Sequence, residues 1–158
     1  MRRSQAILRM PVDQIEVVLI GHDGTRSDAM LFVPPTDAIE QMLDARGNRF
    51  LPTIMGGKVQ LVARDAIAAL GVQSVIAMHQ DGDLPVEVQA VAVHLRSGTV
   101  LEGELRWTAT IGQARTADHL NGPSETLELH ATNLTFHIAK GHIARVEETC
   151  PPNPRGDR

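Results

Sequence analysis

The sequence predicts an all-β protein with short helices, organised as two tandem five-stranded small β-barrels. Three observations support this prediction. The chain has 158 residues, of which 42% are hydrophobic and 22% charged, as is typical of a soluble globular protein. Alternating apolar segments flank turn-forming glycines, and a similar order of segments occurs twice. We expect the two barrels at residues 12–72 and 86–148, followed by a disordered tail at 149–158.

Each half begins with a predicted β-hairpin. Gly24 follows an Asp and Gly98 follows a Ser, and both lie between alternating apolar runs, which is a strong hairpin signal. Gly103 interrupts the second strand of the second hairpin, where a glycine usually marks a bulge or a sharp bend. The corresponding residue of the first half is Ala29, the next smallest choice.

Each half also closes with a similar nine-residue segment. Residues 62–70 read Val-Ala-Arg-Asp-Ala-Ile-Ala-Ala-Leu, and residues 138–146 read Ile-Ala-Lys-Gly-His-Ile-Ala-Arg-Val. The offset between the halves is 74 residues at the turn glycines, Gly24 and Gly98, and 76 residues at Ile67 and Ile143. A two-residue insertion accounts for the difference, so we interpret the chain as an internal duplication.

Between the hairpin and the closing segment of each half we expect short helices and strands. The first half contains a short helix with Ile39, Met42 and Leu43 on one face, ending at Gly47. This apolar face either covers the open end of its barrel or, if exposed, forms a protein-docking surface. The second half has a possible helical turn within residues 114–120. Strands are predicted at 50–54, 58–63, 67–72, 126–130, 134–139 and 143–147.

The second half resembles the Sm-like fold within the class of SH3-like small barrels. The residues that carry this resemblance are a turn glycine, a glycine inside the following strand, an Asp-x-x-Asn segment and a closing basic-Gly-x-Ile segment. They occur in the expected order as Gly98, Gly103, Asp118-His119-Leu120-Asn121 and Lys140-Gly141-His142-Ile143. The first half keeps only Gly24 and the segment from Arg64 to Ile67.

The resemblance implies a possible RNA site. In Sm-like proteins the Asp and Asn of one loop and the basic-Gly pair of another hold an RNA base. The matching residues here are Asp118, Asn121, Lys140, Gly141 and His142. A formal net charge of −4 and an aromatic content of 3% argue against RNA binding, which uses a basic surface and stacking side chains. An RNA-binding Sm-like module is therefore the alternative hypothesis.

Other chemistry finds little support in the sequence. The seven histidines are not accompanied by a Cys-x-x-Cys or His-Glu-x-x-His motif, so we predict no metal site. Cys150 is the single cysteine and lies in the predicted tail, where it cannot be held by neighbours as a nucleophile. Met55-Gly56-Gly57-Lys58 lacks the spacing of a phosphate-binding loop and is interpreted as a hairpin turn. We therefore expect neither catalysis nor a cofactor.

The remaining hypothesis is binding or assembly. Small β-barrels leave strand edges that pair with other strands. We predict a non-catalytic protein-interaction or assembly subunit, part of a homo- or hetero-oligomeric complex, whose partners are proteins through self-association or within a larger complex. The sequence contains no apolar run long enough for a membrane span, and its first ten residues lack the apolar region of a signal peptide. We expect the bacterial cytoplasm and no membrane insertion.

Overall fold

The computed structural model describes residues 13–33, 39–44, 47–74, 86–108, 112 and 115–149, and in this part of the chain it is all-β with one short α-helix. The strands are β1 (Asp13–Gly21), β2 (Arg26–Val33), β3 (Phe50–Met55), β4 (Lys58–Ala63), β5 (Ile67–Gln73), β6 (Val86–Leu95), β7 (Val100–Thr108), β8 (Thr126–His130), β9 (Leu134–Ala139) and β10 (Ile143–Glu148). The helices are the 3-10 helices η2 (Ile39–Leu43), η3 (Arg64–Ala66) and η4 (Lys140–His142) and the α-helix α1 (Thr116–Leu120). Cys150 and the predicted tail from residue 150 onward lie outside the described residues.

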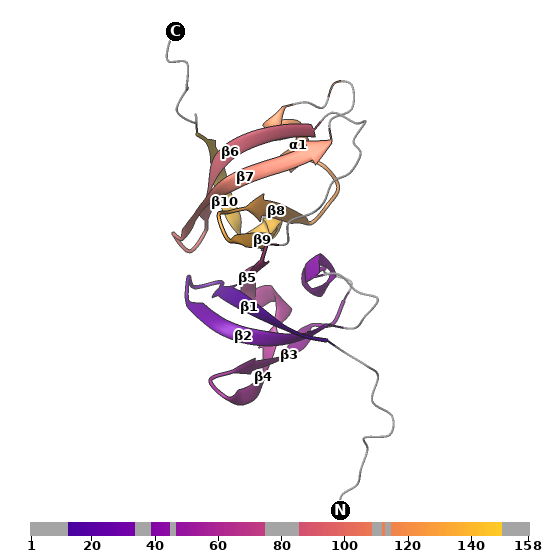
Figure 1. Ribbon diagram of the computed structural model, residues 1–158, viewed down its shortest axis with the longest axis vertical. Coiled ribbons are helices and arrows are strands. Elements are labelled where there is room, and N and C mark those ends of the chain that lie inside the picture. The colour runs from indigo at the N-terminus through magenta and orange to yellow at the C-terminus, as the bar shows by residue number, and fades with distance from the viewer. Residues whose placement is uncertain are drawn as a thin grey trace, which may run out of the picture.

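The strands form one ten-stranded antiparallel sheet in the order β10-β6-β7-β8-β9-β5-β1-β2-β3-β4 (Figure 1). Within it, the first half of the chain contributes the run β5-β1-β2-β3-β4. The second half contributes the run β10-β6-β7-β8-β9. The last strand of each half therefore pairs with the first strand of that half, and the relative order of the five strands is the same in both runs.

The two halves are joined by direct pairing of β5 with β9, in the register Ala69↔Ile138 to Gln73↔Leu134. This differs from the expectation of two separate barrels, because the described strands make one continuous sheet that is not closed. Neither β5 nor β9 contains an Asp, Glu, Lys or Arg. Pairing these two edges satisfies their backbone N–H and C=O groups without burying a full charge.

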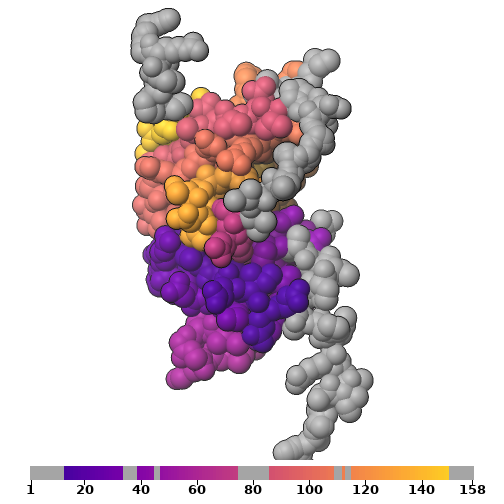
Figure 2. All heavy atoms as spheres, viewed as in Figure 1, coloured from indigo at the N-terminus to yellow at the C-terminus, as the bar shows by residue number. Residues whose placement is uncertain are grey.

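The sheet encloses two hydrophobic clusters, one mainly from each half. The first includes Leu31, Leu51, Ile67 and Leu70, and the second includes Val93, Leu105, Leu127, Leu129 and Ile138. Strand β5 contributes to both clusters, since Ile67 and Leu70 belong to the first whereas Ala68 and Ala69 belong to the second. Figure 2 shows the result in space, with the first half, indigo to magenta, packed directly against the orange and yellow strands of the second.

Matching backbone contacts explain why both halves begin and end alike. The turn glycines Gly24 and Gly98 have φ values of 89° and 100°, a conformation that favours glycine. A register shift interrupts the pairing of the first and last strands in both halves. Two backbone hydrogen bonds of the first half also have equivalents in the second. At the hairpin turns, Gly21 N donates to Thr25 O and Leu95 N donates to Thr99 O, both at 2.8 Å. Before the last strands, Arg64 N donates to Arg49 O at 2.7 Å and Lys140 N donates to Glu125 O at 2.9 Å.

Gly103 is required by a close backbone approach within the second half. A Cβ atom at this position would lie 2.5 Å from the carbonyl oxygen of His130 and 3.1 Å from Cγ of Leu129. The adjacent residue Glu104 pairs with His130, so β8 crosses close to the middle of β7. The glycine predicted from the sequence to mark a bend therefore marks the place where these two strands touch.

Candidate functional site

The sequence-predicted RNA residues lie around the connection between β7 and β8 and around η4. Lys140, the first residue of η4, reaches back to this connection: its Nζ atom donates to the carbonyl oxygens of Leu120, at 2.8 Å, and Gly122, at 3.4 Å. Asn121 lies between these two acceptors. The structure therefore brings Asn121 and Lys140 together, and burial lowers the pKa of Lys140.

Asp118 is engaged within its own helix. Its carboxylate accepts hydrogen bonds from the backbone N and side-chain Nε of Arg115, both at 3.2 Å, and from Nη2 of Arg115 at 3.1 Å. These hydrogen bonds from Arg115 lower the pKa of Asp118. The carboxylate thus stabilises the first turn of α1, where an acidic group also interacts favourably with free N–H groups.

Gly141 and His142 hold η4 against neighbouring turns. The carbonyl oxygen of Gly141 accepts a hydrogen bond from Nε of Arg96 at 2.8 Å. Nε2 of His142 lies 2.9 Å from the carbonyl oxygen of Asp65 in η3, so this side chain links the second half to the first. All five predicted RNA residues are therefore in one region, but the side chains of Asp118, Lys140 and His142 make contacts within the chain.

An aromatic pair beside these residues was missed by the sequence reasoning. The rings of Trp107, at the end of β7, and His119, in α1, are stacked with centroids 4.8 Å apart and an interplanar angle of 6°. Burial and the nearby positive charge of Lys140 lower the pKa of His119. The two residues lie on different elements, and the only signal in the sequence was that Trp107 is the single tryptophan.

The first half uses a basic residue at the same place. Arg64, the first residue of η3, donates from Nη1 to the carbonyl oxygens of Gly47 at 3.2 Å and Asn48 at 2.7 Å. Arg64 precedes Lys140 by 76 residues. In both halves the basic side chain therefore holds the segment that leads into the third strand, which is a structural task independent of any ligand.

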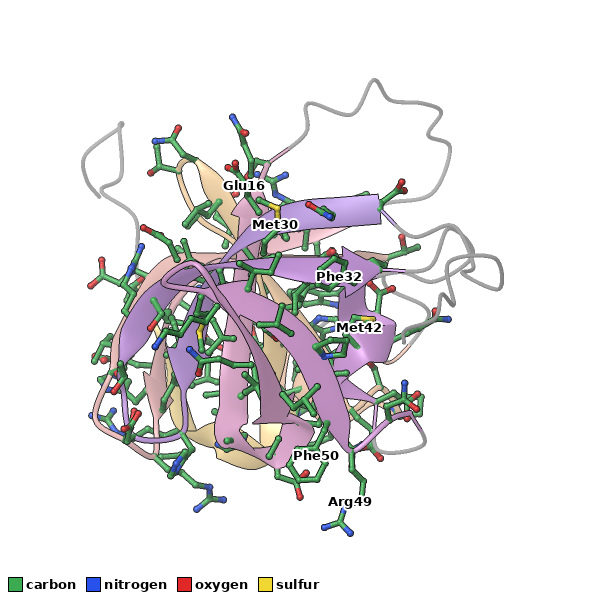
Figure 3. All side chains as sticks on the ribbon, turned by 90° about the horizontal axis from the view of Figure 1, so that it is seen from below. Glu16, Met30, Phe32, Met42, Arg49 and Phe50 are labelled. Carbon is green, nitrogen blue, oxygen red and sulfur yellow. The ribbon has the colours of Figure 1, made fainter. Side chains whose placement is uncertain are left out.

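The predicted protein-interaction residues of η2 lie against the first hydrophobic cluster. Leu43 is buried within this cluster, and Ile39 and Met42 are half-buried against it. Glu40 of η2 approaches the second half, where its Oε1 atom lies 3.9 Å from Nδ1 of His137 in β9 (Figure 3 labels the neighbouring Met42). This helix therefore packs over the first core and also reaches the joined strand of the second half.

His137 is the most enclosed titratable side chain at this junction, with a side-chain exposure of 9%. Oε2 of Glu128 also lies 3.9 Å from its Nδ1 atom, and Oε1 of Glu128 lies 3.5 Å from Nε2 of His130. Burial lowers the pKa of His137, an effect that the two carboxylates of Glu128 and Glu40 oppose. Burial therefore disfavours the protonated imidazole of His137.

Among the described residues, the two most exposed large apolar side chains lie on the hairpin of β3 and β4. Val59 and Leu61 are each 67% exposed, and Phe50 is 55% exposed. The register pairs Ile54 with Val59 and Pro52 with Leu61, so these side chains share the outer face of the hairpin. Figure 3 shows Phe50 at the margin of the molecule beside Arg49, which projects away from the ribbon. The sequence reasoning did not single out these residues, because the alternation of apolar and polar residues at 58–61 is also that of an ordinary half-buried strand, whereas all four are exposed.

Within the described ranges, no group of three or more His, Cys, Asp or Glu side chains could hold a metal ion. None of the helices in this part of the chain is long and apolar enough to cross a membrane. Comparison with known proteins returned no matching family model, no matching curated protein and no matching solved structure.

Proposed function

We propose that the chain is a non-catalytic assembly subunit, built from two tandem Sm-like β units, that joins other protein chains through the edges of its sheet. The identical strand order of the two halves and their matching hydrogen bonds support the tandem arrangement. The resemblance of the second half to Sm-like proteins supports the proposal that each repeat is an Sm-like unit. Each half contributes a run of five strands, and each of the two hydrophobic clusters is formed mainly by one half.

One observation carries this proposal. The halves are joined by edge-to-edge pairing of β5 with β9, and among the described strands β4 and β10 each have only one neighbour. An unpaired strand edge presents free N–H and C=O groups to another strand. On β4 this edge also carries exposed apolar side chains, at Val59 and Leu61. Exposed apolar surface beside an open edge is typical of a protein-binding surface.

The mass of the native complex tests this proposal. We expect the protein recovered under mild conditions from its native cells to elute with a mass, measured by light scattering, well above the 17.2 kDa of the single chain. Leu61→Lys places a charge on the exposed face of β4 and is expected to reduce the complex. Val88→Lys, at an exposed valine of β6 (53% exposed), is the matched control and is expected to leave the complex unchanged. A native protein that elutes as a single chain would refute the proposal.

RNA binding is the second candidate function, and it is favoured by the stacked pair of Trp107 and His119 beside Lys140. Aromatic side chains beside a cation are typical of sites for unpaired bases. The internal contacts of Lys140 and Asp118 and the net charge of −4 favour the assembly proposal instead. Because Trp107 is the single tryptophan, its fluorescence reports on this site directly. Quenching by single-stranded RNA at low salt that is reversed by added salt would favour the RNA function.

The absence of catalysis and the bacterial cytoplasmic compartment stay predictions from the sequence. The assembly proposal uses contacts of the sheet edges alone and requires neither. Copurification of the native protein with nucleic acid, measured as the ratio of absorbance at 260 and 280 nm, separates the two candidate functions. We expect a discrete assembly free of nucleic acid.

A further inference from the structure

The two open edges of the sheet differ in their charged residues. Strands β5 and β9, which pair with each other, contain no Asp, Glu, Lys or Arg. Strand β4 contains a single such residue, Lys58, at its first position, whereas β10 contains Arg145, Glu147 and Glu148. Charged side chains on an edge strand oppose pairing with another strand, because pairing removes them from water. By this criterion β4 resembles the edges that are already joined, and β10 does not.

The β10 charges are also held in place by neighbours. Oε1 of Glu147 lies 3.1 Å from Nε2 of His94 on the adjacent strand β6, and 4.0 Å from Nη1 of Arg145. The side chains of Arg145 and Glu147 are 65% and 55% exposed. A strand that paired with β10 would have to accommodate this charged group. The open edge that accepts a strand at low cost is therefore β4.

The β3–β4 hairpin also lies at the end of the molecule farthest from the second half (Figure 1). Residues 58–61 of β4 are all exposed, and β3 is the only described strand that pairs with β4. A second chain can therefore approach β4 without displacing an element of the described fold.

We propose that the occupant of the β4 edge is a second copy of this chain, bound through its own β4 by two-fold symmetric antiparallel pairing. The inference rests on the proposed assembly function and names its partner. Antiparallel pairing of a strand with a copy of itself is compatible with a two-fold axis, the commonest symmetry of soluble oligomers. This pairing joins the β4 edges of the two copies, which carry no charged residue after Lys58, and leaves both β10 edges in solvent.

The register follows from the faces of the strand. A two-fold axis perpendicular to the sheet must keep the exposed face of one β4 beside the exposed face of the other. Centring the axis on Gln60 satisfies this condition and pairs residues 58–62, five of the six residues of β4. Gln60 then lies opposite Gln60 of the second copy, and Val59 lies opposite Leu61 of the second copy. Both exposed apolar pairs then meet on one face. Each Lys58 lies opposite Val62 of the other copy, so the two ammonium groups are kept apart.

Disulfide trapping tests this register in the full chain. In a Cys150→Ser background, Gln60→Cys places the cysteines directly opposite each other. The Cα atoms of opposed residues in an antiparallel pair are about 4.5–5.5 Å apart, which a disulfide can span. We expect mild oxidation to give a covalent dimer of twice 17.2 kDa, and Glu147→Cys in the same background to stay a single chain. Equal cross-linking of both variants would refute the two-fold pairing.

The double variant Gln60→Cys with Glu147→Cys, again with Cys150→Ser, examines the competing arrangement in which β4 of one copy pairs with β10 of the next. Heterologous contacts of that kind propagate, so they would give a ladder of covalent oligomers above the dimer, which would overturn the inference. A dimer with no larger species supports it.

The two proposals fail in different ways. If the purified chain without engineered cysteines is a single chain by light scattering at every concentration, while the complex from native cells is larger, the assembly function stands and the second copy is not its partner. If both samples are single chains, both proposals fail. Both proposals are supported if the purified chain is a dimer, if Leu61→Lys raises the dissociation constant of this dimer at least tenfold, and if Val88→Lys leaves it unchanged.

Discussion

Replacing Gly103 with alanine tests the close approach of β7 and β8 that bends the second half. The added Cβ atom would lie 2.5 Å from the carbonyl oxygen and 2.9 Å from the carbonyl carbon of His130. Both distances are far below a normal contact of about 3.5 Å between carbon atoms, and the obstructing atoms belong to the backbone. Overpacking of this kind costs about 1–3 kcal/mol of unfolding free energy, since the two strands must separate.

The assay is urea denaturation followed by the fluorescence of Trp107, which lies on the same strand as the substitution. Gly141→Ala is the matched control, because a Cβ atom at Gly141 would meet nothing within 4 Å and its φ is not in the left-handed region. This control is expected to change the unfolding free energy by less than about 1 kcal/mol, with stabilisation possible through a less flexible unfolded chain. If Gly103→Ala is as stable as Gly141→Ala, the close approach of the two strands is wrong.

Three further predictions concern the contacts within and between the halves. Lys140→Met keeps the aliphatic stem but leaves two carbonyl oxygens without their donor, so urea denaturation is expected to show a loss of about 1–3 kcal/mol, with no loss if the ammonium group is free in solution. The pKa of His137 is lowered on folding, so the folded state binds fewer protons than the unfolded state. The free energy of unfolding is therefore expected to fall as the pH drops below about 6.5. In denaturation curves measured from pH 7.5 to 5, His137→Gln should reduce the change of this free energy with pH. Gly71→Ala would place a Cβ atom 2.8 Å from the ring of Phe136 in β9. Hydrogen exchange of the backbone amides of β5 and β9 is therefore expected to accelerate, and an unchanged exchange rate would contradict this contact.

Local patterns in the sequence were sufficient to predict most of the elements. The turn glycines Gly24 and Gly98 mark hairpins because only a residue without a Cβ atom readily adopts their positive φ. The alternation of residues 126–130 and 134–139 predicted β8 and β9, whose inward side chains form one core. These signals depend on neighbours in the chain, and the resulting all-β class is what the structure has.

The contacts that sequence reasoning missed join segments that are far apart in the chain. The pairing of β5 with β9 was not predicted, because residues 67–72 were interpreted as the closing strand of the first unit and residues 134–139 as an inner strand of the second. The stack of Trp107 on His119 depends on where α1 lies over the end of β7, which no periodicity specifies. For the same reason the sequence named Lys140 only as an RNA-binding residue under the alternative hypothesis, and did not predict that its ammonium group donates to the carbonyl oxygen of Leu120 in α1.

The corresponding strands β4 and β9 differ in their neighbours: β9 pairs with β5 of the other half, whereas β4 pairs only with β3 among the described strands. His137 is buried at the junction, and the residue 76 positions earlier is Leu61, which is 67% exposed. At the junction, η2 of the first half reaches this position through Glu40, while the equivalent position on β4 has no such cover among the described residues. Val59 is also 67% exposed, so the two side chains leave an apolar patch on β4, and such a patch marks an interaction surface. The exposure of Leu61 in the single chain is therefore itself an argument that β4 is completed by another strand.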